Sequence, residues 1–290
     1  MKRRQLSPYR FTGRTAVLTG AASGIGEQLA HGLAARGSDL VLIDRDALRL
    51  DAVAERIRAA HPGRTVETLV ADLGDRAAVI STAGAVRERH PAIGLLINNA
   101  GMALGGRFDQ LDVAQFEQVM AVNFTAPMLL IHHLLPALTA APGGHLVNVS
   151  SLYGLIAPPG QSAYSASKFA LRGLSEVLRG ELIESGVGVT TVHPGGVRTR
   201  IAENAQIGAG VPAAEVGAQQ RIFAALLTYP PEKAAREILD GVERRRGRVL
   251  IAASAKIPDL LARLLPVGHL RVIGRLTAAA GRRARTAATR

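Results

Sequence analysis

Along most of the chain, short apolar runs alternate with longer segments in which apolar residues recur at helical spacing. The apolar runs have the length of strands, end at glycine, proline or polar clusters, and lie at 14–20, 39–44, 65–70, 93–98, 145–150, 187–193 and 248–252. Segments of helical period separate them, including 27–36, 115–138, 161–185 and 231–246. Strands that alternate with helices from Thr15 to Ala252 predict an α/β fold: a single doubly wound parallel, Rossmann-like sheet of about seven strands with helices on both faces.

Composition narrows the class of protein further. Of the 290 residues, 48% are hydrophobic and 20% are charged, so the chain is globular and long enough to bury a sizeable core. It contains no cysteine, which excludes disulfides and thiolate metal sites. Residues 1–10 are basic but lack the apolar segment of a secretory signal, and no uncharged apolar run reaches the roughly 18 residues of a membrane span. A cytoplasmic location is therefore expected.

The formal net charge of +12 is concentrated near the C-terminus. Residues 244–290 contain twelve Arg or Lys and one acid, Asp259, so they carry +11 of it. The rest of the chain is nearly neutral. Arginine outnumbers lysine 31 to 4, and we attribute part of that excess to genomic base composition. Five of the eight histidines are scattered without the spacing of metal ligands and indicate no metal site: His31, His90, His132, His133 and His145.

A glycine-rich turn joins the first expected strand to the first expected helix. Gly20, Gly24 and Gly26 follow the first apolar run, and helical period begins at residue 27. Glycines permit a tight turn and close approach of a ligand to the backbone, while the helix N-terminus presents free N–H groups and the positive end of its dipole. Strand, turn and helix in this order predict a binding site for the phosphates of a dinucleotide, with Gly-x3-Gly-x-Gly as a variant of the common spacing.

The second expected strand ends on an acid. Asp44 follows Gly24 by twenty residues, where a carboxylate accepts both hydroxyls of an adenosine ribose and repels a 2′-phosphate. This favours NAD over NADP. The next residue, Arg45, keeps the alternative open, because an arginine at this point could hold the phosphate of NADP instead.

Two further segments place polar groups at interruptions of the regular pattern. The fourth expected strand leads into residues 98–101, Asn-Asn-Ala-Gly, which form either a simple turn or a wall of the adenosine pocket. In the helical segment 115–138, Pro127 cannot donate to the carbonyl of Asn123, four residues earlier, so a kink is expected there. The segment is either an ordinary bent helix or one whose freed carbonyl holds a functional water.

The residues best suited to catalysis follow the fifth expected strand. Tyr164 and Lys168 are four residues apart in a stretch without Gly or Pro, so a helix places the phenol and the ammonium on one face. A free tyrosine keeps its proton up to a pKa of about 10, and a neighbouring ammonium lowers that pKa toward acid/base work near neutrality. Ser151 lies thirteen residues before Tyr164 and could hold a substrate oxygen beside the phenol. Taken alone, Tyr-x3-Lys is far more often a solvated helix face, so the other motifs decide the matter.

Taken in order, these motifs resemble the short-chain dehydrogenase/reductase family over roughly residues 12–252. The resemblance rests on Thr19-Gly20-x3-Gly24-x-Gly26, Asn98-Asn-Ala-Gly101, Asn123, Ser151, Tyr164-x3-Lys168 and Pro194-Gly195. It implies that Tyr164 is the general acid/base, and that Lys168 lowers its pKa and binds the nicotinamide ribose. It also implies that Ser151 orients the substrate oxygen and that Asn123 anchors a water of the proton relay.

The resemblance further implies a cofactor site along the ends of the strands. The pyrophosphate and adenosine side would be lined by Gly20, Ser23, Gly24, Ile25 and Gly26. The adenosine half would be lined by Asp44, Asp72, Asn98 and Ala100, and the nicotinamide amide would contact Val197 and Thr199. The other positions expected at the cofactor are Arg45, Leu73, Gly101, Tyr164, Lys168, Pro194 and Gly195. No metal is expected there.

The same resemblance implies a domain organisation. Residues 13–254 would form one dinucleotide-binding catalytic domain. Within it, the segment 201–230 has glycine and proline interspersed and is expected to be irregular and mobile, on the substrate side. Residues 1–12 would form a basic N-terminal tail, and residues 255–290 a basic amphipathic C-terminal extension that lies outside the resemblance.

The reaction implied is reversible hydride transfer between a nicotinamide cofactor and a secondary alcohol or ketone, with NAD as cofactor and NADP as the runner-up. The apolar run 152–159 favours a lipophilic substrate, and an NADP-dependent 3-oxoacyl-thioester ketoreductase is the alternative within this class. A homodimer or homotetramer is expected. A non-catalytic cofactor-binding protein would not need Ser151, Tyr164 and Lys168 together. No nucleic-acid partner is expected, because the basic tail lacks interleaved aromatic residues.

The C-terminal extension carries an amphipathic pattern with two open interpretations. One helical face would present Ile257, Leu260, Leu261, Leu264 and Leu265, with Asp259 and Arg263 opposite. A second segment would present Val272, Ile273, Leu276 and Ala280, flanked by Arg271, Arg275 and Arg282. Either these apolar residues pack on the chain's own substrate loop or on a partner subunit, or they make a peripheral, salt-sensitive contact with an anionic membrane. The absence of aromatic residues from the tail argues against deep insertion.

Overall fold

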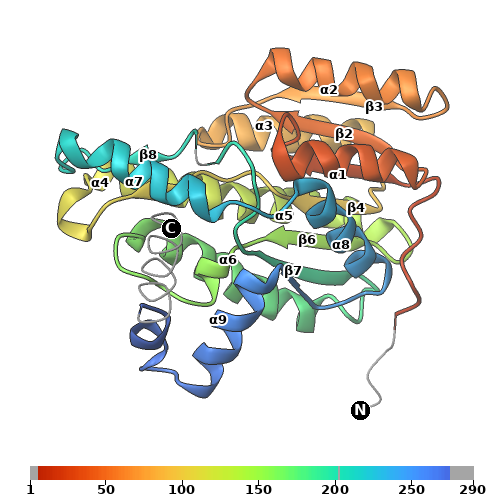
Figure 1. Ribbon diagram of the computed structural model, residues 1–290. Coiled ribbons are helices and arrows are strands. Elements are labelled where there is room, and N and C mark those ends of the chain that lie inside the picture. The colour runs from red at the N-terminus through yellow and green to blue at the C-terminus, as the bar shows by residue number, and fades with distance from the viewer. Residues whose placement is uncertain (1–5, 202, 275–290) are drawn as a thin grey trace, which may run out of the picture.

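A parallel sheet of seven strands forms the centre of the molecule, in the order β3-β2-β1-β4-β6-β7-β9 (Figure 1). The computed structural model describes residues 6–201 and 203–274. The strands of the sheet are Thr15–Thr19 (β1), Asp39–Asp44 (β2), Val66–Val70 (β3), Leu95–Asn98 (β4), His145–Val149 (β6), Gly188–Pro194 (β7) and Arg248–Ile251 (β9). Each neighbouring pair in it is parallel. The predicted α/β class and seven-stranded parallel sheet are confirmed.

Helices cover both faces of this sheet. One apolar core lies against α1 (Gly24–Ala35), α2 (Ala47–Ala60) and α8 (Pro231–Glu243). The other lies against α3 (Arg76–Arg89), α5 (Ala126–Ala140) and α6 (Ser162–Glu181). Successive side chains of β1 alternate between the two cores, Val17 in one and Leu18 in the other, and both are fully buried. Burial on both faces explains why the strands read as continuous apolar runs rather than alternating ones.

The strand order reverses at β1, which has β2 on one side and β4 on the other. The connection after β1 leads toward β2, and the connection after β4 leads away from β1 on the other side. Where such connections diverge, a crevice opens at the carboxyl ends of the strands. All the strands are parallel, and their carboxyl ends therefore meet at one edge. The glycine turn after β1, residues 98–101 after β4, Ser151 after β6 and Pro194 at the end of β7 all lie along that edge.

The long apolar helix changes its hydrogen-bonding pattern near the predicted kink. α4 (Val113–Met120) continues through a π-helical turn, η2 (Ala121–Thr125), into α5. The N–H of Ala126 bonds the carbonyl of Ala121, five residues earlier, and Pro127 follows in the first turn of α5. The π turn thus occurs just before the proline, where an ordinary helical bond is lost. By length and hydropathy the stretch Val113–Ala140 also resembles a membrane span, but α5 packs against α3 and the sheet, as a core helix does.

The segment between β7 and α8 is more regular than the sequence predicts. It contains α7 (Ala213–Leu226) and a short strand, β8 (Gln206–Ile207), that pairs with β5 (Leu104–Gly105), close to the 3-10 turn η1 (Phe108–Gln110). The expectation of an irregular segment over 201–230 is therefore wrong for its second half. Gly208, Gly210 and Pro212 precede the helix, with Pro212 as its N-cap, while Gly217 lies within it and Pro230 follows it. Most of these residues therefore mark the ends of α7 rather than interrupting it.

Both boundaries of the domain differ from the expected ones. Tyr9 and Phe11 are buried in the core against α1 and α8, so the part of residues 1–12 that follows residue 8 belongs to the domain rather than to a tail. At the other end, α9 (Ala253–Leu264) begins directly after β9 and packs on β9 and on the 3-10 turn η3 (Leu152–Gly154). Residues 269–274 begin a further helical segment, while Arg275, Leu276, Ala280 and Arg282 lie outside the described residues.

Candidate functional site

The glycine turn after β1 is held against the residues that follow β4. Gly20 has a φ of +66°, and a Cβ at this position would lie 2.8 Å from the Cα of Ala100, so only glycine allows the approach. The hydroxyl of Thr19 accepts the N–H groups of Asn99 at 3.0 Å and Ala100 at 3.1 Å. The side-chain amide of Asn99 donates to the carbonyl of Gly20 at 3.1 Å. The turn is therefore fixed by the protein itself.

The segment after β7 meets the start of α1 across this turn. Gly24, the first residue of α1, has a φ of +58°, and a Cβ there would lie 3.0 Å from the side chain of Thr199. Ser23 is the N-cap, Ile25 and Gly26 are buried behind it, and Val197 is buried beside Thr199. A helix N-terminus with a glycine backbone and no bulky side chain above it suits the phosphates of a dinucleotide. The residues present fit a nucleotide cofactor.

Asp44 is positioned at the adenosine end of the edge. One carboxylate oxygen accepts the N–H of Ala22 in the glycine turn at 2.9 Å, and the other accepts the N–H of Asp46 at 3.1 Å. A carboxylate oxygen can accept more than one bond, so the group is fixed yet can still receive ribose hydroxyls. Arg45 is exposed. Asp72, which follows β3, is exposed and accepts the N–H of Gly74 at 2.8 Å, and Leu73 is buried.

The two asparagines after β4 differ in direction. The side chain of Asn98 is buried in the core and donates to Asn148 of β6 at 2.9 Å, while Asn99 contacts the glycine turn. Neighbouring side chains on a strand face opposite sides of the sheet, so only one of the two can reach the turn. The side chain of Asn99 and the backbone of Ala100 therefore lie against the glycine turn, and Asn98 can contribute to that edge only through its backbone. The place of Asn98 in the adenosine half stays a prediction.

Ser151 and Tyr164 are in contact at the centre of the edge. Ser151 follows β6 and caps η3 by accepting the N–H of Tyr153 at 3.1 Å. Its hydroxyl also hydrogen-bonds the phenol of Tyr164, which lies in the first turn of α6. The ring of Tyr153 meets the ring of Tyr164 edge-on, with 6.1 Å between centroids. The phenol is thus held by one hydroxyl and one aromatic ring, close to the end of β6.

Lys168 lies one helical turn after Tyr164 and is almost fully buried. Its ammonium donates to the carbonyl of Val149 at 3.0 Å and lies 5.8 Å from the centre of the Tyr164 ring. A Cβ at Gly101 would come within 3.2 Å of the ammonium, so this glycine leaves room for it. The predicted pairing of Tyr164 and Lys168 on one face of a helix is what the structure shows, beside the exit of β4.

Burial governs the pKa values of both groups. It raises the pKa of Tyr164 to about 12, although the hydrogen bond from Ser151 acts in the opposite direction. It lowers the pKa of Lys168 to about 8. The expected lowering of the tyrosine pKa by Lys168 is not seen in this geometry, because the ammonium bonds Val149 and desolvation of the phenol dominates. Tyr164 therefore holds its proton at neutral pH, the form that can protonate a carbonyl oxygen.

Asn123, in the π turn, is fully buried and ties three elements together. Its side chain accepts the N–H of Met102 at 2.9 Å and donates to the carbonyl of Met102 and the hydroxyl of Ser167, both at 3.0 Å. The amide group is thus engaged with the chain after Gly101 and with α6. A water held by this residue would have to use the backbone carbonyl, which remains the sequence-based prediction.

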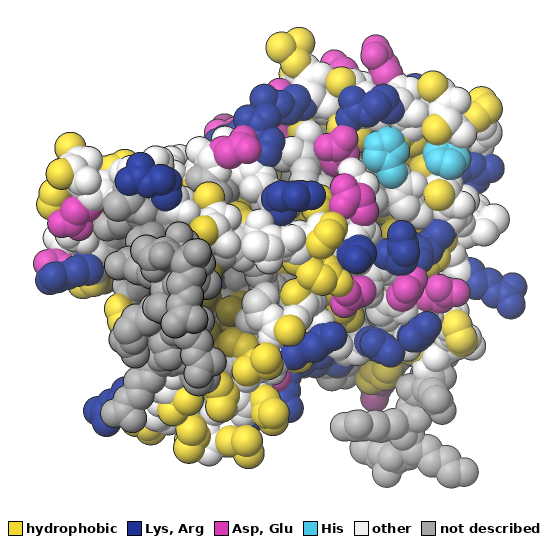
Figure 2. Space-filling model, viewed as in Figure 1, with side chains coloured by type: hydrophobic (Ala, Val, Ile, Leu, Met, Phe, Trp, Pro, Cys, Tyr) yellow, Lys and Arg dark blue, Asp and Glu magenta, His cyan; other side chains and the backbone are white. Residues whose placement is uncertain are grey.

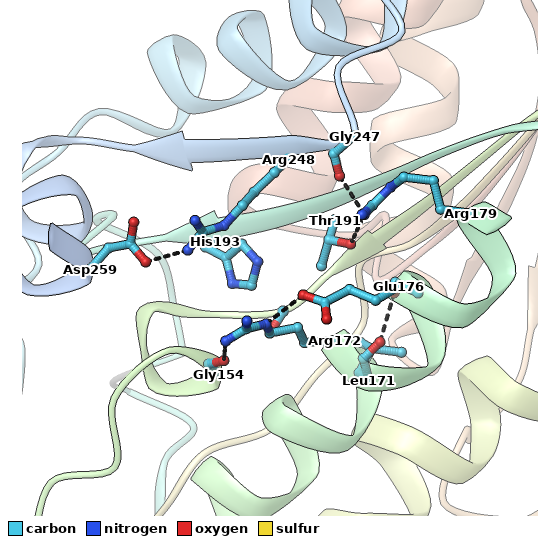
Figure 3. Close-up of polar contacts among 12 residues, drawn as sticks. Gly154, Leu171, Arg172, Glu176, Arg179, Thr191, His193, Gly247, Arg248 and Asp259 are labelled. Carbon is cyan, nitrogen blue, oxygen red and sulfur yellow. Dashed lines mark hydrogen bonds and ion pairs between the residues drawn. The ribbon is translucent and has the colours of Figure 1, made fainter. Parts of the chain in front are cut away.

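His193, which was not predicted from the sequence, contacts the backbone of Ser151. His193 is buried on β7, and its Nδ1 lies 3.0 Å from the carbonyl oxygen of Ser151. Burial lowers its pKa to about 4, so the ring is neutral and Nδ1 carries the proton that is donated to this carbonyl. Figure 3 shows the ring among Arg172, Arg248 and Asp259, which joins this support to α6, β9 and α9. In the sequence, His193 directly precedes the Pro194-Gly195 motif, and this position could have indicated that it lies near the site.

A cavity of about 450 Å³ is lined by Tyr153, whose ring contacts that of Tyr164. Leu104, Ile207 and Leu226 supply apolar lining from β5, β8 and α7. Two charged side chains, Arg107 and Glu215, also line it. Within the described part of the chain, no three His, Asp or Glu side chains gather into a group that could hold a metal ion. The site therefore combines a nucleotide cradle, an acid/base pair and a mostly apolar cavity.

Comparison with known proteins identifies relatives of this chain. The profile of the short chain dehydrogenase family matches residues 14–209. The SadH protein of Mycobacterium tuberculosis is 38% identical over 271 residues, which cover 91% of this chain and 95% of that protein.

Solved structures show the same likeness. A short-chain dehydrogenase/reductase from Burkholderia phymatum in complex with NAD superposes with a TM-score of 0.80 at 29% identity, over 88% of this chain and 94% of the other. A short-chain dehydrogenase from Sphingobium yanoikuyae in complex with NADPH gives a TM-score of 0.71 at 33% identity, over 95% of each chain. Close structural relatives thus bind either cofactor.

Proposed function

This chain belongs to the short-chain dehydrogenase/reductase family of NAD(P)-binding oxidoreductases, and from that premise we propose that it transfers a hydride between NAD and a secondary alcohol or ketone. One observation carries the proposal: Ser151, Tyr164 and Lys168 converge at the carboxyl edge of the sheet, next to Tyr153, which lines the cavity. A scaffold that only binds nucleotide does not need a phenol hydrogen-bonded to a serine at this position.

In the proposed reaction the protein supplies positions and a proton. The hydroxyl of Ser151 holds the substrate oxygen next to the phenol of Tyr164. In reduction, Tyr164 gives its proton to that oxygen as the carbonyl becomes an alcohol, and in oxidation the same atom takes the proton back. A bound nicotinamide cofactor supplies or accepts the hydride. Lys168 binds the nicotinamide ribose, and its ammonium lies on the same helical face as the phenol of Tyr164.

Asp44 supports NAD as the cofactor. Its carboxylate is fixed on the glycine turn by the N–H groups of Ala22 and Asp46, so it cannot swing away from a 2′-phosphate without losing both bonds. A negative charge held there favours a ribose diol over a phosphate. Ser23, in the glycine turn, offers no positive charge, and the exposed Arg45 is the residue that would compensate if NADP were preferred.

The lining of the cavity supports a lipophilic substrate. Leu104, Ile207, Leu226 and the ring of Tyr153 present apolar surface, and such lining favours burial of hydrocarbon near the reacting carbon. We propose a secondary alcohol or ketone with a sizeable apolar substituent, handled by a cytoplasmic homodimer or homotetramer. The cavity volume of about 450 Å³ is in the range of pockets that bind small molecules.

A substrate panel tests the proposal. Aliphatic, alicyclic and aromatic ketones, with an acetoacetyl thioester, are incubated with NADH and separately with NADPH, and oxidation of the cofactor is followed by absorbance. Turnover of apolar ketones with a higher kcat/KM for NADH is expected. Preference for NADPH would contradict the role given to Asp44. A preference for the thioester would replace the lipophilic ketone by the 3-oxoacyl class, and turnover of no ketone or alcohol with either cofactor would overturn the function.

A further inference from the structure

The apolar face of α9 points away from the molecule. Ile257, Leu260 and Leu264 on the helix, and Leu265 and Val267 after it, are exposed, with Leu264 at 68% and Val267 at 93% of full accessibility. We call these five residues the α9 face. Figure 2 shows a cluster of hydrophobic side chains at the lower end of the molecule, where Figure 1 places α9. The described part of the chain does not bury these side chains, so the expected packing on the chain's own substrate loop is not what the structure shows.

A buried ion pair fixes this orientation. Asp259, on the opposite side of α9, is 6% exposed and accepts a hydrogen bond from Arg248 of β9 (Figure 3). Arg263 lies 3.3 Å from its other oxygen. Rotating the helix to bury the leucines would break the ion pair between Asp259 and Arg248. Leaving a buried charge unpaired is strongly destabilising. The helix is therefore held with its acid inward and its apolar face outward.

Positive charges accompany the α9 face. Lys256 and Arg263 are exposed on the same helix, and Arg271 is exposed in the helical segment that follows. Asp259 is the only acid in residues 244–290, and it faces inward against Arg248. An apolar stripe with cations beside it, and without exposed anions, complements a surface that is negatively charged outside and apolar beneath.

From this geometry we propose that the α9 face docks on an anionic lipid membrane. The five apolar side chains enter the headgroup region, while Lys256 and Arg271 lie against the lipid anions. The face carries no aromatic residue, which fits shallow contact.

Two other occupants fit less well. A second copy packed on the same face around a two-fold axis would bring the same cations together, which is unfavourable. Residues 275–290 contain one large apolar residue, Leu276, and five arginines, so their composition offers little apolar surface to cover five side chains.

Docking would also orient the active site. α9 packs on η3, the turn that follows Ser151, and the hydroxyl of Ser254 at the start of α9 accepts the N–H of Gly196 at 3.1 Å. The membrane would therefore lie on the side of the molecule that holds η3 and the segment after β7. This inference does not depend on the proposed reaction.

Vesicle binding by the full-length chain tests the proposal. The protein is sedimented with phosphatidylcholine vesicles with and without phosphatidylserine, at low and high salt. Binding is expected with phosphatidylserine at low salt, and weak binding under the other conditions. The double variant Leu260→Ser/Leu264→Ser should lower the partition coefficient about tenfold or more. Lys256→Gln/Arg271→Gln should lower it roughly fivefold for each charge removed.

Leu48→Ser provides the matched control, because Leu48 is 86% exposed on α2, away from α9, and should leave binding unchanged. Circular dichroism and turnover check that each variant is folded, and the charge variant tests the proposal even if the leucine variant does not fold. Failure of the wild-type chain to sediment with anionic vesicles would overturn the proposal, as would full binding by either double variant. Vesicle-independent loss of an oligomer in the leucine variant, seen by analytical ultracentrifugation, would assign the face to a second copy instead.

Discussion

The sheet and α9 use leucine, isoleucine and valine in opposite ways. In β1 and β2 these side chains are fully buried between helices, and polar groups stand only at the two ends of each strand, with Thr19 and Asp44 at the carboxyl ends. In α9 the acid Asp259 is buried, while Ile257, Leu260 and Leu264 are exposed. The first arrangement produces a rigid edge on which a nucleotide and a substrate oxygen can be aligned. The second produces a surface.

The difference shows that apolar periodicity identifies a face but not its partner. A strand in the middle of a parallel sheet has both faces covered, so its side chains have no alternative to burial. A helix packed at the margin of the domain, such as α9, has only one side covered by protein. The interaction that is most costly to lose determines which side is covered. In α9 that interaction is the pairing of Asp259 with Arg248, since an unpaired buried carboxylate costs more than an exposed leucine.

The largest expected effect belongs to the catalytic edge. Replacing Tyr164 by Phe should lower kcat by about a thousandfold, because the transferable proton is lost while the ring is kept. The dissociation constant of the cofactor, followed by fluorescence of the reduced form, should change little. Tyr153→Phe is the control, since Tyr153 contacts Tyr164 but is given no proton to transfer. If the Tyr164→Phe variant kept more than a small fraction of the wild-type kcat, Tyr164 would not be the general acid/base.

The next effect compares the stability of the two regions directly. Leu134→Ala in α5, where the side chain is fully buried, should lower the free energy of unfolding by about 2–5 kcal/mol. Leu264→Ala on the α9 face should change it by no more than about 0.5 kcal/mol. Urea unfolding without vesicles measures both. A loss of more than about 1 kcal/mol at Leu264 would show that the side chain is buried in solution, and the contrast between the regions would fail.

The smallest effect is a pH dependence confined to the catalytic edge. The pKa of Lys168 is lowered to about 8 by burial, so its charge is present below that pH and is lost above it. The pKa of Tyr164, raised to about 12, leaves the phenol protonated throughout. The kcat/KM of ketone reduction should therefore be constant from about pH 6 to 7 and fall above about pH 8. A profile that stays level up to pH values near 10 would mean that the charge of Lys168 is not needed.

The features that could be predicted from the sequence are those for which the local pattern permits only one arrangement. The strands could be read as apolar runs, and Tyr164 and Lys168 as neighbours on one helix, because strand burial and helical spacing leave little freedom. The side chain of Asn99 contacts the glycine turn while that of Asn98 bonds Asn148, and this depends on the side of the sheet that each residue faces, which a one-residue difference reverses. The contact of Lys168 with Val149, and the support of Ser151 by His193, join segments that are distant in sequence and have no local signature.

The C-terminal part shows the same limit. The amphipathic pattern of α9 was visible in the sequence, but the ion pair that orients the helix involves Arg248, which the pattern did not include. The helix α7 was missed because glycine and proline before residue 213 resemble those of a mobile loop. In both cases the deciding contact lies outside the segment that carries the pattern.

We propose above that the residues at this edge of the sheet promote hydride transfer to a carbonyl carbon. The most direct measurement follows the hydride itself: NADH carrying deuterium at C4 on the transferred face is incubated with the preferred ketone, and the product is examined by mass spectrometry. We expect an alcohol with one deuterium on the carbinol carbon, formed by the wild-type chain and lost in Tyr164→Phe. An alcohol without deuterium, or equal incorporation by the variant, would contradict it.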